Sequence, residues 1–205
     1  MIDASDLNHE TISGPGPEFR PAVDVIFIVD AEYIINNYPR PTHPEPNCPV
    51  NLGSSGNFDN TNTKSPIYIA THISDTYSPK SALSGDTIRV PLNSNIRWRA
   101  ISISVNFDYT ILLYEFIKRK GSNLISLPES YLVKSQNIPA LPPNVYANGW
   151  YVPDFVLAED RYFQSTVNNY RTDEENGEMY TWRFAIYRKN KLYGFYGFDP
   201  YIEVY

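Results

Sequence analysis

The clearest pattern of apolar and polar positions lies in the first quarter of the chain. Five consecutive apolar residues, Val25 to Val29, are followed by a polar break that starts at Asp30. A short run of β-branched and aromatic side chains is typical of a strand covered on both faces, so we expect two layers around one core. Asp30 can cap a short helical turn over residues 31–36. The turn should end before Pro39, because the residue preceding a proline favours an extended backbone.

Further along the chain, short runs alternate apolar with polar residues. In residues 101–105 and 182–187 the alternation has period two, which is typical of antiparallel sheets with one solvated face. Lys189-Asn190 lies between two aromatic runs and predicts a hairpin tip, and Asn176-Gly177 predicts another tight turn. The strands expected after the first cover residues 66–73, 87–91, 95–104, 109–117, 131–134, 149–158, 180–188, 191–198 and 201–205.

These runs predict an all-β fold: a single-domain antiparallel β-sandwich, jelly-roll or Greek-key like, with long irregular loops and one short helical turn. Residues 1–21 hold Gly14-Pro15-Gly16-Pro17 and are expected to form an N-terminal arm, with residues 22–205 as the sandwich. Residues 40–65 contain four prolines and predict a long loop. A loop of that length is either disordered or fastened to the body, and we favour the second.

Composition and charge exclude several classes of partner. The chain has 17 basic and 23 acidic residues, a formal charge of −6, which argues against nucleic acid or an anionic membrane as the main partner. No run approaches the roughly 20 apolar residues of a membrane span, and the N-terminus lacks the basic start and apolar stretch of a signal peptide. Cys48 is the only cysteine, which fits a reducing compartment. We therefore expect a cytoplasmic protein.

No motif typical of a catalytic centre occurs in the sequence. His9, His43 and His72 stand outside any recognisable motif, and no Gly-x-Ser-x-Gly turn is present. Cys48 has no basic neighbour in sequence to lower the pKa of its thiol. We therefore expect no enzymatic activity and no cofactor.

Acidic and amide side chains gather in two tracts that could bind calcium. Residues 57–62 and 173–178 offer oxygen ligands, but neither has the spacing of a known calcium loop, so we favour solvated turns and expect no metal. Asp30 and Glu32 could also act as an acid and base pair at a strand end. A helix cap and a surface charge explain them with fewer assumptions.

The tripeptide Arg97-Trp98-Arg99 places two cations on one face of a strand and an indole on the other. We favour Trp98 in the core and both arginines outside. Planar guanidinium groups form two-point contacts with carboxylates, so the arginines are expected to pair with acids such as Asp86 or Glu115. A phosphate site is the weaker alternative.

Several segments form a distinctive set in their order and spacing. They are Val29-Asp30-Ala31-Glu32-Tyr33-Ile34-Ile35, Asn37-Tyr38-Pro39, Ile96-Arg97-Trp98-Arg99, Asp108-Tyr109, Tyr114 and the run from Leu192 to Pro200. Together they resemble the AidA/PixA family of bacterial inclusion-body proteins, over roughly Asp24 to the C-terminus. The resemblance implies a small cytoplasmic protein of host-associated bacteria that accumulates in paracrystalline inclusions, and it implies no catalytic residues. Only Met1 and Met179 are methionines, so the sulfur-storage role of methionine-rich members is not expected.

Aromatic residues are abundant: 17 tyrosines, 10 phenylalanines and 3 tryptophans, concentrated in residues 146–163 and 180–205. Exposed tyrosines make good anchors for protein contacts or for sugar rings, because they combine a large apolar face with a polar tip. One hypothesis is self-assembly through contacts that propagate without closing a ring. The alternative is a lectin-like shelf that binds a glycan through Trp150 and Tyr151, with Asn148 or Asp154 nearby; ordinary packing would explain any single tyrosine.

Six aromatic residues are our candidates for contacts in self-association or ligand binding. They are Tyr38, Phe58, Trp150, Tyr151, Tyr193 and Tyr196.

Overall fold

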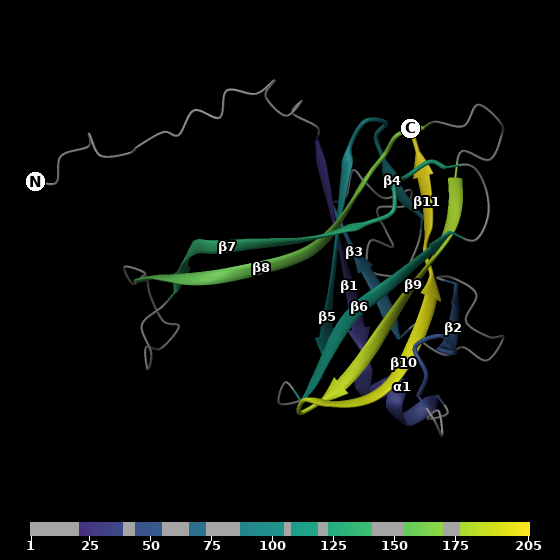
Figure 1. Cartoon of the computed structure of the whole chain (residues 1–205), viewed down its shortest axis with the longest axis vertical. Helices are drawn as coiled ribbons and strands as arrows, with labels where there is room; N and C mark the ends of the chain where they lie inside the picture. The colour runs from purple at the N-terminus through teal and green to yellow at the C-terminus, as the bar shows by residue number, and fades with distance from the viewer. Residues whose placement is uncertain are drawn as a thin grey trace, which may run out of the picture.

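The structure is a computed structural model that describes residues 21–38, 44–54, 66–72, 87–104, 108–118, 123–140, 154–169 and 177–205. These residues form two β-sheets that pack around one core, and one short helix (Figure 1). The elements in chain order are β1 (Ala22–Asp30), α1 (Ala31–Asn37), β2 (Val50–Ser54), β3 (Ile67–Ala70), β4 (Ile88–Val90), β5 (Asn95–Ile103), β6 (Tyr109–Lys118), β7 (Glu129–Ala140), β8 (Asp154–Thr166), β9 (Gly177–Arg188), β10 (Lys191–Asp199) and β11 (Tyr201–Val204).

Each sheet combines strands from distant parts of the sequence. The five-stranded sheet has the order β3-β1-β5-β8-β7, and the six-stranded sheet has the order β2-β10-β9-β11-β4, with β6 paired to β9. The predicted all-β sandwich with one short helix is confirmed. The sheets are mixed, however, because β1 with β5, β10 with β2 and β11 with β4 are parallel pairs. The alternation of apolar and polar residues along a strand indicates which face is buried, but it does not indicate whether the neighbouring strand runs parallel or antiparallel. The parallel pairs could therefore not be predicted from the sequence.

Strand β1 contributes one face to the core. Val23, Val25, Phe27 and Val29 are buried, and the residues between them are half-buried or exposed. The expectation that β1 is covered on both faces is therefore wrong. Among the described residues, β3 and β5 are the strands that lie beside β1 in this sheet.

Helix α1 begins where the sequence predicts and ends at Asn37, one residue later than predicted and still before Pro39. Asp30 Oδ1 accepts a hydrogen bond of 2.9 Å from the backbone N–H of Tyr33, which caps the first turn. Ala31 and Ile34 are buried under the helix. Tyr38 follows with an extended backbone, φ −110° and ψ 145°, as expected of a residue before proline.

Aromatic rings fill the space between the sheets. The rings of Phe27 and Trp98 lie 5.8 Å apart, and those of Trp98 and Trp182 5.7 Å apart. Phe116 contacts Trp182 edge-on at 5.0 Å, a geometry that aromatic pairs favour. Both indoles are fully buried, which confirms the prediction for Trp98.

The proline-rich segment 40–65 is fastened to the body in its described part. Strand β2, which the sequence analysis missed, pairs in parallel with β10. The Tyr114 hydroxyl also donates a hydrogen bond of 2.7 Å to the carbonyl oxygen of Pro46. The prediction of a single long loop is wrong at β2, and the prediction that the segment is fastened holds for residues 44–54.

The predicted hairpin between β9 and β10 is confirmed. Lys189 and Asn190 have positive φ angles of 45° and 65°, as a tight turn requires. Asn176, in the second predicted turn, lies outside the described residues, and so does the predicted arm 1–21 apart from Pro21.

Strands β7 and β8 depart most from the predicted boundaries, residues 131–134 and 149–158. They pair with each other from Glu129 opposite Gln164 to Ala140 opposite Asp154. Pro139 is tolerated because β7 lies at the edge of its sheet. In Figure 1 the two strands leave the body of the molecule together.

Candidate functional site

The structure places three of the six predicted contact residues. Tyr38 and Tyr193 are half-buried and pack against the core. Tyr196 is fully buried, with its ring stacked 5.8 Å from that of Phe184. Within the chain its ring is therefore a core element rather than a surface anchor. The other three, Phe58, Trp150 and Tyr151, lie outside the described residues.

Large exposed apolar side chains gather instead on the part of β7 and β8 that leaves the body. We call this part, residues 130–140 and 154–162, the ribbon. Phe155 and Leu157 are the most exposed, at 68% and 72%. The ribbon also exposes Tyr131, Leu132, Val133, Ile138 and Val156. Residues 131–134 and 149–158 were predicted as strands, but none of these exposed apolar residues was predicted to make contacts.

Both faces of the ribbon expose apolar side chains near its far end. Phe155 and Leu157 alternate with Val156 along β8, so they lie on one face and Val156 on the other. The strand register places Ile138 opposite Val156 and Pro139 opposite Phe155. A two-stranded ribbon without a covering layer is only marginally stable in water. The ribbon is therefore a surface that gains stability when another surface covers it.

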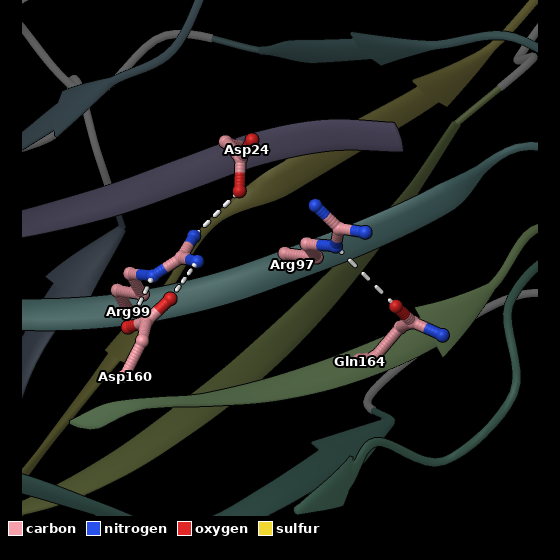
Figure 2. Close-up of polar contacts among 5 residues, drawn as sticks. All are labelled: Asp24, Arg97, Arg99, Asp160 and Gln164. Carbon is pink, nitrogen blue, oxygen red and sulfur yellow. Dashed lines mark hydrogen bonds and ion pairs between the residues drawn. The ribbon is translucent and has the colours of Figure 1, made fainter. Parts of the chain in front are cut away.

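At the base of the ribbon, a charged network joins three strands on the outer face of the sheet (Figure 2). Arg99 on β5 lies between two carboxylates. Its Nη1 is 2.5 Å from Asp24 Oδ1 on β1, and its Nη2 is 2.6 Å from Asp160 Oδ2 on β8. Nε of Arg99 donates a further hydrogen bond of 3.2 Å to Asp160 Oδ1, so the contact with Asp160 is two-pronged. Beside it, Arg97 Nε lies 3.5 Å from Gln164 Oε1.

This network shifts the ionisation of its members. The hydrogen bonds from Arg99 hold the pKa of Asp160 below its usual range, against the opposing effect of burial. The same contacts, first with Asp160 and then with Asp24, raise the pKa of Arg99. The two carboxylates thus compensate the charge of Arg99, which favours a structural role over the alternative of a phosphate site.

Aromatic rings extend the network toward the ribbon. The guanidinium carbons of Arg99 and Arg97 lie 4.9 Å and 5.4 Å from the ring centroid of Tyr162. Tyr162 in turn stacks on Tyr131 at 5.6 Å, with an angle of 10° between the rings. These stacked groups link β5 to both strands at the base of the ribbon.

One predicted partner of these arginines is bound elsewhere. Glu115 lies on β6 in the other sheet, where its Oε2 is 2.6 Å from Nη1 of Arg183. The prediction that Glu115 pairs with Arg97 or Arg99 is therefore wrong, because Glu115 and these arginines lie in different sheets. Asp86, the other predicted partner, lies outside the described residues.

A groove opens on the inner side of the ribbon base, where β8 separates from β5. The pairing of β5 with β8 runs from Asn95 opposite Thr166 to Trp98 opposite Phe163. Beyond that point a groove of about 320 Å³ lies between the strands. Its lining is mixed: Ala100, Phe163, Ile111, Leu112 and Leu113 are apolar, whereas Arg99, Ser130 and Arg161 are polar or charged. Leu112 is 51% exposed, so an apolar surface continues from the groove to the outside.

A buried polar cluster lies at the other end of β6. The Tyr180 hydroxyl donates a hydrogen bond to Oε2 of Glu178, and Nζ of Lys118 lies 3.7 Å from Oε1 of Glu178. Burial, together with the Glu178 carboxylate, raises the pKa of Tyr180. Glu178 belongs to the second predicted calcium tract, but its buried side chain interacts with Tyr180 and Lys118 rather than lying in a solvated turn.

The remaining candidates for chemistry lie apart from one another. Asp30 caps α1, while Glu32, Cys48 and His72 are exposed at separate positions. Within the described ranges, no group of three or more histidine, cysteine, aspartate or glutamate side chains could hold a metal ion. In the same ranges, no helix has the length and apolar character needed to cross a membrane. His9, His43 and residues 57–62 lie outside the described part of the chain.

Comparison with known proteins identifies one family and one fold. A family model described as "PixA: Inclusion body protein" matches residues 21–204. Among solved structures, the chain is similar to the crystal structure of an inclusion body protein of this type from Burkholderia cenocepacia J2315. That match has a TM-score of 0.67 and 12% identity, and it covers 91% of this chain and 97% of the other. No curated protein matches the chain.

Proposed function

Because the chain belongs to the PixA family of inclusion body proteins, we propose that it is a non-enzymatic protein that self-assembles into ordered, paracrystalline bodies. We place these bodies in the cytoplasm of a host-associated bacterium. The observation that carries the proposal is the clustering of exposed apolar side chains on two separate surfaces. One surface is the ribbon.

The second surface lies on the outer face of the five-stranded sheet. Ile101 and Ile103 on β5 are 50% and 49% exposed. Ile101 lies opposite Ile28 of β1, which is itself opposite Tyr68 of β3, and both of these are half-buried. We call these four residues the outer patch. Contiguous exposed apolar residues of this kind often mark sites of protein association.

Two surfaces in different places matter because ordered growth needs more than one kind of contact. A contact between identical patches related by a two-fold axis closes after two copies. A second, different contact then links each closed unit to the next. The ribbon and the outer patch together meet this requirement within a single chain.

A non-enzymatic role is supported by the contacts of the ionisable groups. Arg99 and Asp160 make a close charged contact, Glu178 is buried, and each of the three contacts a neighbouring strand. In these positions they stabilise the sandwich rather than forming a shared acid and base centre in a cleft.

Electron microscopy of thin sections from expressing cells tests the proposal. We expect bodies with a regular lattice for the parent chain, and loss of the lattice for a variant carrying Ile101→Lys and Ile103→Lys. Leu127→Lys is the matched control, because Leu127 is 71% exposed and lies outside both surfaces. Parent protein that stays dispersed at high expression would refute self-assembly. Glycan binding stays a prediction, and a glycan array would reveal it.

A further inference from the structure

The far end of the ribbon cannot fill the groove at the base of the same ribbon. Ser130 and Tyr162, at the ribbon base, are among the groove's lining residues, and the ribbon leads away from them. Phe155 and Leu157 lie near the far end of the ribbon. The tip of a ribbon therefore lies far from the groove of its own chain.

Among the residues that the structure describes, the edge of β5 beside the groove is only partly paired. β5 pairs with β1 along its whole length, from Asn95 to Ile103. On its other side it pairs with β8 only as far as Trp98. Residues 99–103 of β5 thus present a sheet edge to the groove in the described structure, and an edge of this kind is a template for a strand from another chain.

The ribbon has the length to reach such an edge in a second copy. β7 continues from Leu132 to Ala140 beyond the base, which is about 30 Å at about 3.4 Å per residue. If two ribbons lie side by side in antiparallel orientation, the tip of each meets the base of the other. Because each base carries a groove, this one arrangement places both tips in grooves at once.

We propose that two copies of the chain exchange ribbons, so that Phe155 and Leu157 of each copy lie against Leu112 and the apolar part of the groove of the other. The dimer has two-fold symmetry and is closed, because the same pair of surfaces meets twice. The claim that this dimer is the building unit of the bodies rests on the proposed function. The claim that the dimer exists in solution rests only on the ribbon and the groove.

The two ribbons alone supply about half of the area of a stable dimer. Two ribbons about 30 Å long and about 10 Å wide that lie face to face cover about 300 Å² on each, which is about 600 Å² in total. Stable interfaces bury about 1,200–2,000 Å² in total, so the two grooves that receive the tips, with the surfaces beside them, must supply the rest. A second copy fits as the partner because each chain carries both the ribbon and the groove that would receive it.

Light scattering after size-exclusion chromatography of the full chain tests the exchange. We expect the parent to have the mass of a dimer. Leu157→Lys on the ribbon and Leu112→Glu at the groove rim should each weaken dimerisation by at least about 30-fold, because each places a charge in an apolar contact. Leu127→Lys should leave the dimer unchanged, and circular dichroism checks that every variant is folded.

Mixing the two variants distinguishes exchange from simple loss of a surface. In a mixed dimer, the lysine introduced at position 157 of one chain would face the glutamate introduced at position 112 of the other, while the second ribbon and groove retain their native leucines. We therefore expect Leu157→Lys and Leu112→Glu to be monomers alone and dimers together. Two monomers that stay separate on mixing, or a Leu157→Lys variant that remains a dimer, would overturn the exchange.

The outcomes also separate this inference from the proposed function. A monomeric parent that still forms lattice-bearing bodies in cells would overturn ribbon exchange and leave self-assembly intact. A dimeric parent with the expected variant behaviour, in cells without bodies, would support the exchange and refute self-assembly.

Discussion

The indole Nε1 of Trp98 donates a hydrogen bond of 3.1 Å to the hydroxyl of Ser165, and both side chains are fully buried. The bond joins β5 to β8 just before the two strands separate at the groove. Ser165→Ala leaves the indole N–H without this partner in the core. We expect a loss of about 1–3 kcal/mol in the free energy of unfolding, measured by urea titration.

Ser130→Ala is the matched control for this prediction. Ser130 is exposed on β7, so its replacement should change the free energy of unfolding by less than about 0.5 kcal/mol. Equal urea midpoints for the parent and Ser165→Ala would show that the buried bond contributes nothing measurable.

The contact of Asp160 with Arg99 predicts a dependence of stability on acidity. Because Arg99 lowers the pKa of Asp160 in the folded state, this contact stabilises the fold above about pH 4, and the gain is lost as the pH falls through the lowered value. Both side chains are partly exposed, so solvent screening limits the gain to about 0.5–1 kcal/mol. Asp160→Asn should be less stable than the parent by this amount at about pH 7, and the difference should shrink as the pH falls below about 4.

Urea unfolding of both proteins across this pH range measures the difference. Glu159→Gln is the control, since Glu159 and its partner Arg161 are both mostly exposed and 3.3 Å apart. It should follow the parent at every pH. A constant gap between Asp160→Asn and the parent from neutral to acid would contradict the assignment to this carboxylate.

Buried Tyr180 predicts a loss of stability in alkali. Its pKa is raised in the folded state, so the stabilising contribution is complete below about pH 10, the unfolded value, and falls as the pH rises above it. For this one group the decline approaches about 1.4 kcal/mol per pH unit. Tyr180→Phe should therefore lose stability less steeply above about pH 10, although it is less stable at neutral pH because the bond to Glu178 is gone. Chemical unfolding at a series of pH values measures the free energy of unfolding, and tyrosinate absorbance follows the ionisation of the tyrosines. Equal slopes of the free energy of unfolding against pH above about pH 10, for the parent and Tyr180→Phe, would count against the prediction.

Two glycines on β10 provide a matched pair for core packing. A Cβ at Gly194 would lie 3.2 Å from ring and hydroxyl atoms of Tyr196, which is fully buried, whereas a Cβ at Gly197 would meet its nearest neighbour at 3.6 Å. Gly194→Ala should destabilise by about 1–3 kcal/mol, since the ring must move within a packed core. Gly197→Ala should be neutral or stabilising by up to about 1 kcal/mol. Thermal unfolding compares the two, and the opposite order would show that the Tyr196 ring moves freely.

Local chemistry made some features predictable from sequence. Asp30 needs only the free N–H groups of the next few residues to act as a cap, and Tyr38 needs only Pro39 to become extended. Trp98 is a large apolar ring between two arginines, so alternation alone assigns it to the core. The positive φ angles at Lys189 and Asn190 likewise follow from a short connection between two aromatic strands.

Features that depend on distant residues were not predictable. Strand β2 contains Asn51 and Gly53, which disfavour strands, and it exists because β10 lies beside it. Tyr193 and Tyr196 lie in a run that is aromatic on both faces, so its pattern gave no indication of which ring is inside. The ribbon was missed because an apolar run such as Phe155-Val156-Leu157 has the same signature whether its cover is the same chain or another.

The parallel pairing of β2 with β10 and of β4 with β11 has a consequence for biosynthesis. Both early strands must wait until the end of the sequence has emerged from the ribosome before they find their neighbours. A chain dominated by such long-range contacts has high contact order and folds slowly. During that delay its unpaired apolar strands are exposed to other nascent copies, so cells that make this protein abundantly depend on folding outpacing disordered aggregation.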